Sequence, residues 1–261
     1  MSGRIAAIFR HPVKGFTPEP LHRADLEAGR SFPADRIYAV ENGPSGFDPD
    51  KPEFIPKQKF TVLAAIPQVA HARTAYDPAS GVLTAKAPGR PPFAGALTEA
   101  AGREAFAAWL TALLGDAARG PLKVLPAGSD AHAFTDHPLG HVSIVNLASV
   151  RDLEARLGRP LDPLRFRANL YVEGWPAWAE LDWAGRELAL GPVGARVFKS
   201  IVRCAATHVD PATGERDVEV TRALFDHYGH MNCGIYVHVT AGGPVGVGDA
   251  CLAPQASDVP E

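Results

Sequence analysis

The chain has 261 residues, of which 46% are hydrophobic and 21% charged, with a formal net charge of −3 at pH 7. This length and composition are typical of a soluble globular protein with one large core or two smaller ones. The slightly negative charge excludes a general attraction to nucleic acid or to anionic membranes. Because no apolar stretch reads as a membrane span or a signal peptide, we expect a cytoplasmic protein with no membrane partner.

Short apolar or alternating runs, separated by glycine and proline clusters, predict a chain made mainly of strands. The 25 glycines and 24 prolines are spread along the sequence, as expected for many turns between short strands. Strands are predicted at residues 4–9, 37–40, 61–65, 69–75, 122–125, 142–145, 169–172, 187–190, 193–198, 235–239 and 246–252.

Helical periodicity is confined to a few segments. For the helix predicted at residues 147–157, Asn146 is the expected N-cap and Gly158 the expected C-terminal stop. This excess of strands over helices predicts a β-rich α+β fold, a barrel with a few peripheral helices. A weak boundary falls within residues 115–130, after the first long helix. Helices are predicted at residues 99–114, 147–157 and 221–227.

Cys204 is the most specific chemical handle in the sequence. The three cysteines, at 204, 233 and 251, have no paired spacing that would hold zinc or an iron–sulfur cluster. A thiolate at 204 could ligate a metal or act as a nucleophile, but the segment alone favours a small buried core residue. If the strand continues through 204, Arg203 points to the opposite face. An activating cation or metal must then come from elsewhere in the fold.

Two further segments carry groups that suit an anion. On an extended chain Arg165, Arg167 and Asn169 project to one side, which gives a face suited to phosphate or carboxylate. Lys14 follows the first predicted strand on a loop bounded by proline and glycine, and Arg36 opens the next strand. A solvated polar strand face and ordinary surface turns are the alternatives for these segments.

The histidines at 132, 137 and 141 form the densest histidine group. Their spacing fits no compact metal site, and we expect solvated loop histidines. Basic residues do not alternate with aromatic ones along a strand, which argues against a nucleic-acid platform.

Ordered motifs along nearly the whole chain resemble those of a known family. They are His11-Pro-Val-Lys14, Asp35-Arg36-Ile-Tyr-Ala-Val40, Phe134-Thr-Asp136 before Val142-Ser-Ile-Val145, Phe166-Arg-Ala-Asn169, Arg203-Cys204 with Thr207-His-Val-Asp-Pro-Ala-Thr-Gly214, and Asn232-Cys-Gly-Ile-Tyr236 before Gly246-Val-Gly-Asp249.

In this order they resemble the MOSC-domain family, named for the C-terminal domain of molybdenum cofactor sulfurase. Within it, the chain is most similar to the branch of the mitochondrial amidoxime-reducing component and its bacterial relatives. The resemblance implies an N-terminal β-rich domain over residues 1–118, a MOSC β-barrel over 119–254 and a flexible tail over 255–261.

The resemblance also implies a molybdenum cofactor, a pterin that carries molybdenum, between the two domains. Cys204 matches the cysteine that ligates the metal, and the residue is therefore expected to be both catalytic and metal-binding. Lys14 and Arg36 match positions that grip the cofactor's phosphate, while Arg167 and Asn169 match further cofactor contacts. A phosphate dianion suits lysine and arginine, and a thiolate suits such a metal.

The implied activity is reduction of N-hydroxylated small molecules, such as hydroxylamines, amidoximes and N-hydroxylated bases. Three cysteines are too few for a fused ferredoxin-type cluster, so the electrons are expected from a separate ferredoxin- or flavin-type protein. The alternatives are a sulfur or cofactor carrier that uses Cys204 as a persulfide or ligand, and a binding module without activity.

This chain also departs from the family pattern at three places. Gly15 stands where relatives often carry serine, which removes one hydroxyl contact to phosphate. Lys57-Gln-Lys59 replaces a common Gln-Arg pair, and Ala168 replaces a common proline. These changes leave the thiol and the main cations in place.

Overall fold

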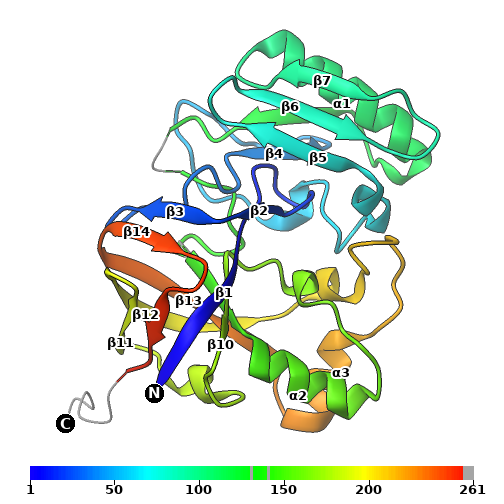
Figure 1. The fold of residues 1–261 in the computed structure, drawn as a ribbon. Helices are drawn as coiled ribbons and strands as arrows, with labels where there is room; N and C mark the ends of the chain where they lie inside the picture. The colour runs from blue at the N-terminus through cyan, green and yellow to red at the C-terminus, as the bar shows by residue number, and fades with distance from the viewer. Residues whose placement is uncertain (130–131, 140–141, 255–261) are drawn as a thin grey trace.

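The computed structural model describes residues 1–129, 132–139 and 142–254. The chain folds into two lobes, a barrel built mostly from its second half and a smaller β-rich lobe built mostly from its first (Figure 1). The predicted tail over 255–261 and the predicted loop histidine His141 lie outside the described residues. No helix in the described ranges is long and apolar enough to cross a membrane. The cytoplasmic location stays a prediction.

The barrel is a closed sheet in the order β10–β9–β13–β12–β11–β15–β1, with β1 pairing back to β10 and β2 added beside β1. Alternate residues of β12, including Val193, Ala195 and Val197, are buried in its interior, as expected for a small barrel filled by side chains. Its strands are β1 (Ser2–Arg10), β2 (Glu19–Leu21), β9 (Val142–Asn146), β10 (Leu170–Glu173), β11 (Glu187–Leu190), β12 (Val193–Val202), β13 (Asn232–Ala241) and β15 (Ala250–Leu252).

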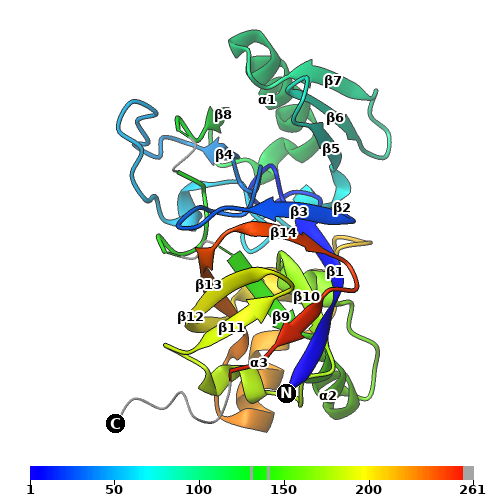
Figure 2. The same ribbon diagram turned by 60° about the vertical axis from the view of Figure 1, so that its left-hand side comes forward.

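The smaller lobe packs helix α1 (Ala100–Leu114) against short antiparallel sheets. Phe106 and Leu110 of α1 are fully buried in its core. The β3–β14 pair lies across the barrel, on the side that faces this lobe (Figure 2). The remaining strands are β3 (Arg23–Leu26), β4 (Tyr38–Asn42), β5 (Arg73–Asp77), β6 (Val82–Lys86), β7 (Phe93–Ala96), β8 (Leu122–Pro126) and β14 (Gly243–Gly246).

The helix predictions are confirmed to within a residue at each end. Besides α1, the structure has α2 (Leu147–Leu157) and α3 (Val220–Tyr228). The side chain of Asn146 accepts from the Ala148 amide at 3.0 Å, and Gly158 ends the helix in the left-handed conformation, at φ 66°. The local capping signals therefore identified the helix ends correctly.

Several strand predictions are wrong. Residues 61–65 form a turn in which the Ala65 and Ile66 amides both donate to the Val62 carbonyl at 2.9 Å. Residues 69–71 belong to a 3₁₀ helix, Pro67–His71, and only Arg73–Asp77 is strand. The strand predicted at 246–252 is interrupted after Gly246 and resumes only at Ala250–Leu252. Strands β2, β3, β6, β7 and most of β14 were not predicted. They have three to five residues each, too short for a clear alternating pattern.

The two lobes exchange a strand across the expected boundary at 118/119. β1 begins the chain yet closes the barrel between β15 and β10. β8, after the boundary, pairs with β4 in the smaller lobe. Each lobe therefore contains a strand from the other side of the 118/119 boundary.

Candidate functional site

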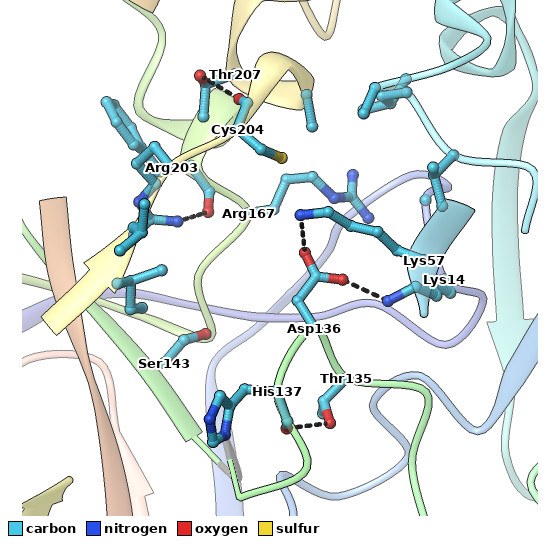
Figure 3. Close-up of a pocket in the computed structure, with 18 of the residues that line it drawn as sticks. Lys14, Lys57, Thr135, Asp136, His137, Ser143, Arg167, Arg203, Cys204 and Thr207 are labelled. Carbon is cyan, nitrogen blue, oxygen red and sulfur yellow. Dashed lines mark hydrogen bonds and ion pairs between the residues drawn. The ribbon is translucent and has the colours of Figure 1, made fainter. Parts of the chain in front are cut away.

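A cavity of about 230 Å³ lies where loops of the two lobes meet, and both lobes contribute its charged lining (Figure 3). The segments after β1 and around η1 (Lys57–Lys59) supply Lys14, Arg36 and Lys57. The barrel side supplies Arg167 and Cys204. The structure thus brings together residues that are far apart in the sequence.

Cys204 faces this cavity from the end of β12 (Figure 3). The strand stops at Val202, and Cys204 caps a 3₁₀ helix, Ala205–His208, whose Thr207 amide and hydroxyl donate to the Cys204 carbonyl at 3.0 and 2.9 Å. The strand thus runs past its predicted end at 198 but stops before 204, so strand alternation does not set the direction of the Cys204 side chain. Of the other thiols, Cys233 is fully buried, and burial raises its pKa to about 12.

Lys57 is a cation from the other lobe that lines the same cavity as Cys204. Its ammonium lies 3.4 Å from the Asp136 carboxylate. Burial works against the charged ammonium, but Asp136 and then Cys204 outweigh it and raise the pKa of Lys57. Arg203 instead donates to the Cys233 and Phe166 carbonyls. Sequence reasoning missed Lys57, whose one signal was its departure from the family pattern.

One carboxylate, Asp136, serves two ammonium groups. Lys14 is 3% exposed, donates to the Phe134 carbonyl at 2.9 Å and forms an ion pair with Asp136. Lys57 lies 3.4 Å from the other oxygen of the same carboxylate. Burial would raise the pKa of Asp136, but these two ammonium groups hold it well below its usual value. The wall of the cavity therefore keeps a surplus of positive charge.

Arg36 and Arg167 meet across the lobes. Both adopt the left-handed conformation, at φ 55° and 53°, which residues with side chains rarely do outside functional or tightly held sites. Arg36 Nη2 donates to the Arg167 carbonyl at 3.0 Å. Burial, and next the charge of Arg36, lower the pKa of Arg167 to about 10. Arg167 Nη2 is buried and finds no acceptor among the described residues, so an anionic ligand would satisfy it.

Asn169 lines the cavity but is committed to the protein. Its Oδ1 accepts from the Ser143 amide and hydroxyl at 3.1 and 2.8 Å, and its Nδ2 donates to the Phe9 carbonyl at 3.3 Å. The side chain thus ties the start of β9 to β1. Its role as a cofactor contact stays a prediction.

The expected common face of Arg165, Arg167 and Asn169 is wrong. Residues Pro163–Phe166 form a 3₁₀ helix and Arg167 is left-handed, so the segment is not extended. Arg165 turns to ion pairs with Asp210 and Asp217 at 2.9 and 2.8 Å. Its charge is therefore largely neutralised by the protein.

The glycine at 15 is a backbone requirement. Gly15 has φ +90°, and a Cβ there would come within 2.9 Å of the Thr61 carbonyl oxygen and 3.1 Å of Val62 Cα. A serine would therefore be strained at this position. The backbone of Gly15 forms part of the cavity wall.

Two of the predicted loop histidines are less solvated than expected. His137 lines the cavity, and burial, followed by the charge of Lys199, lowers its pKa. The ring of His132 lies 5.4 Å from that of Phe47 and 5.3 Å from that of Phe134. These contacts place both side chains in the packing around the site.

The donor set fits a group that brings its own metal ligands. In the part of the chain that the structure describes, no cluster of three or more His, Cys, Asp or Glu side chains could hold a metal ion. A single cavity-facing thiol opposite an unsatisfied arginine donor suits an anionic prosthetic group with a thiophilic metal. Fold and site define a barrel protein with a cationic, thiol-bearing cavity.

Comparison with known proteins identifies the family. Residues 2–119 match the MOSC N-terminal beta barrel domain, and residues 131–251 match the MOSC domain. Together these matches cover most of the chain, which belongs to the MOSC-domain family.

Individual relatives match over shorter stretches. The chain is 35% identical to mitochondrial amidoxime-reducing component 1 of Mus musculus over 74 residues, which are 28% of this chain and 21% of that protein. It is 35% identical to molybdenum cofactor sulfurase of Caenorhabditis elegans over 101 residues, 37% of this chain and 14% of that one. The match thus spans about a fifth or less of these relatives. A crystal structure of the YuaD protein from Bacillus subtilis aligns over 96% of this chain and 94% of its own, with a TM-score of 0.45 and 14% identity.

Proposed function

We propose that this protein is a molybdenum-cofactor-dependent oxidoreductase that reduces N-hydroxylated compounds with electrons from a separate ferredoxin- or flavin-type protein. The observation that carries the proposal is the inter-lobe cavity, where the Cys204 thiol faces the unsatisfied donor of Arg167. The similarity to proteins named amidoxime-reducing components supports the substrate class, which comprises hydroxylamines, amidoximes and N-hydroxylated bases.

The charged lining divides into two roles. Cys204 would ligate the molybdenum, and Lys14, Arg36 and Arg167 would hold the phosphate of the pterin. Asn169 would keep β9 and β1 in register beside them. When bound, the cofactor supplies the two-electron chemistry that removes oxygen from the substrate nitrogen.

Lys57 and Asp136 would act on the substrate side. Lys57 stays an ammonium at neutral pH because Asp136 and Cys204 raise its pKa. It can therefore donate a hydrogen bond to the oxygen of an N-hydroxyl group beside Cys204. Asp136 stays a carboxylate and restrains the Lys57 and Lys14 side chains. Reduction of a hydroxylamine to an amine and water consumes two electrons from the donor and two protons.

The test is the molybdenum and pterin content of protein made in a host that makes the cofactor, with turnover of a hydroxylamine by a chemical reductant. Wild type should carry both and turn over. Cys204→Ala should lose activity while the cationic residues retain pterin, and Cys251→Ala, at a buried thiol, should behave as wild type. Wild type without molybdenum or pterin would contradict the proposal.

A carrier of sulfur or cofactor is the second candidate. The similarity to proteins named molybdenum cofactor sulfurase supports this candidate. A carrier needs the same cavity-facing thiol but no turnover of an N-hydroxylated compound. A persulfide trapped on Cys204 in metal-free protein, with no hydroxylamine reduction by loaded protein, would favour it.

A further inference from the structure

We propose that Asp35 and His11 are positioning residues, a buried pair that fixes the Arg36 guanidinium so that it can bind an anionic phosphate in the cavity. The inference rests on the proposed function, which takes this cavity as the site of the phosphate. Nothing in the sequence pattern assigned a role to either residue beyond its place in a motif.

The carboxylate of Asp35 is oriented at both of its oxygens. It is 2% exposed, and its Oδ1 accepts from the His11 amide at 2.6 Å and lies 3.2 Å from His11 Nδ1. Its Oδ2 forms an ion pair with Arg36 Nη1. One oxygen is therefore held by His11, and the other is directed at the guanidinium.

His11 stays neutral, so the charge of Asp35 is available to Arg36. The ring is fully buried, and burial, then the charges of Arg36 and Arg167, lower the pKa of His11 to about 3. The neutral ring donates one hydrogen bond from Nδ1, and Nε2 finds no partner among the described residues. Among the described residues, Asp35 then has one ion pair with a fully charged cation, Arg36.

The backbone of Arg36 is held at the same place. Its amide donates to the His11 carbonyl at 2.6 Å, and its carbonyl accepts from the Phe134 amide at 2.9 Å. These two bonds keep the residue in its left-handed conformation, at φ 55°. With Nη1 on Asp35 and Nη2 on the Arg167 carbonyl, the plane of the guanidinium is fixed where the residue lines the cavity.

Burying a carboxylate costs free energy unless a cation and hydrogen bonds compensate for its lost hydration. Here the ion pair with Asp35 also restricts the Arg36 side chain before an anion binds, so that less conformational freedom is lost on binding. Pre-organisation of this kind raises affinity by lowering the cost of ordering. The pair should therefore be visible in anion binding itself, without the cofactor.

The test is calorimetric binding of inorganic phosphate to cofactor-free full-length protein. Asp35→Asn and Arg36→Met should each weaken binding about tenfold, the loss expected for one charge-assisted contact. The double variant should bind no more weakly than Arg36→Met alone, because Asp35 acts through Arg36. Glu180→Gln, which alters another fully buried acid, should bind as wild type.

Three results would overturn the inference. The first is that Asp35→Asn binds phosphate as tightly as wild type. The second is that the double variant binds more weakly than Arg36→Met, by the factor that Asp35→Asn loses alone. The third is that Glu180→Gln loses as much phosphate affinity as Asp35→Asn. If wild type still binds phosphate through Arg36 in any of these cases, the proposed function stands. If wild type binds neither phosphate nor pterin, both the inference and the proposed function are wrong. Should Asp35→Asn fail to fold, Asp35→Glu gives the same test, because it keeps the charge but displaces the carboxylate.

Discussion

At the scale of single residues, the cationic side chains of the cavity differ in how closely acids pair with them. Lys14 and Lys57 share one carboxylate, Arg36 has Asp35, and Arg167 relies on no acid in direct contact among the described residues. The open positive charge therefore lies where the two lobes meet. This is the place at which a ligand with several negative charges gains most.

Lys57 gives the first prediction at this scale. Lys57→Met removes the ammonium that pairs with Asp136 in the cavity that Cys204 lines. Loss of one charge-assisted hydrogen bond costs about 1.5–3 kcal/mol, so kcat/KM for a hydroxylamine should fall about 10- to 100-fold in loaded protein. Lys59→Met, at an exposed lysine of the same 3₁₀ helix, is the control. An equal loss in both variants would contradict a specific role.

His11 gives a prediction about pH. Because its pKa is lowered to about 3 in the folded protein, the unfolded chain binds its proton first as the pH falls below about 6.5. The stability that neutral His11 provides is complete above that pH and is lost as pH falls toward 3. The slope is at most about 1.4 kcal/mol per pH unit.

Chemical denaturation of wild type and His11→Gln from pH 4.5 to 7.5 measures this slope. The variant should be less stable at neutral pH and should lose less stability on acidification. Parallel curves for the two proteins would show that His11 does not titrate on unfolding in this range.

At the residue scale, the motif order carried most of the information. Lys14, Arg36, Arg167 and Cys204 line one cavity, and their roles in binding a cofactor or metal stay predictions. The position of Lys57 in the same cavity as Cys204 could not be predicted, since one comes from a 3₁₀ turn of one lobe and the other from a strand end of the other lobe. Only tertiary structure places such residues together.

At the scale of elements, the segment after Cys204 links the lobes. Residues 209–217, gold in Figure 1, reach the smaller lobe, where Arg73 donates to the Pro211 and Ala212 carbonyls. His71 Nε2 lies 2.9 Å from the Thr213 carbonyl oxygen. On the barrel side, Arg165 holds the segment through Asp210. The turn signal in the sequence thus marks an inter-lobe connection, which local patterns did not indicate.

Arg73→Met should loosen this connection. The two lost bonds are exposed, so each contributes about 0.5–1.5 kcal/mol at most and the fold should persist. The Gly214 amide, which donates to the Asp210 carbonyl, should exchange its hydrogen faster in Arg73→Met than in wild type. Arg30→Met, at an exposed arginine, is the control, and unchanged exchange at Gly214 would contradict the role of Arg73.

The sequence predicted elements with local signals well and elements that depend on tertiary pairing poorly. Helix α2 has its own cap at Asn146 and its own stop at Gly158, so local signals suffice. Strand β7, with the sequence Phe-Ala-Gly-Ala, has little intrinsic strand preference and exists because β6 pairs with it. The turn at 61–65 has buried apolar residues that line the cavity. Its apolar sequence therefore resembles that of a buried strand, although the reason for its burial is tertiary.

At the scale of the whole molecule, a ligand in the cavity would contact both lobes. Lys14 comes from the segment after β1, and Cys204 from the end of β12. A ligand that binds only the assembled form adds RT ln(1 + [L]/Kd) to stability, about 2.7 kcal/mol at 100 times Kd. Loaded protein should therefore melt several degrees above cofactor-free protein in calorimetry, and equal melting temperatures would contradict inter-lobe binding.

The exchanged strands lead to a prediction about dissection. A cut at 118/119 leaves residues 1–118 without β8, whose Leu122 and Val124 belong to the core of the smaller lobe. It leaves residues 119–254 without β1, so that the edges of β10 and β15 are unpaired. Neither fragment should fold alone, and the two should fold when produced together, as circular dichroism and chromatography would show.

The matched control is residues 11–129, which drop β1 but keep β4, β8 and α1. This fragment retains nearly all of the apolar core that runs from Val13 to Val124 and should be more structured than residues 1–118. Sequence motifs predicted a boundary at 118/119 but could not show which lobe each strand completes, because strand pairing is a long-range property. If residues 1–118 folded as well as residues 11–129, β8 would not be needed to complete the smaller lobe.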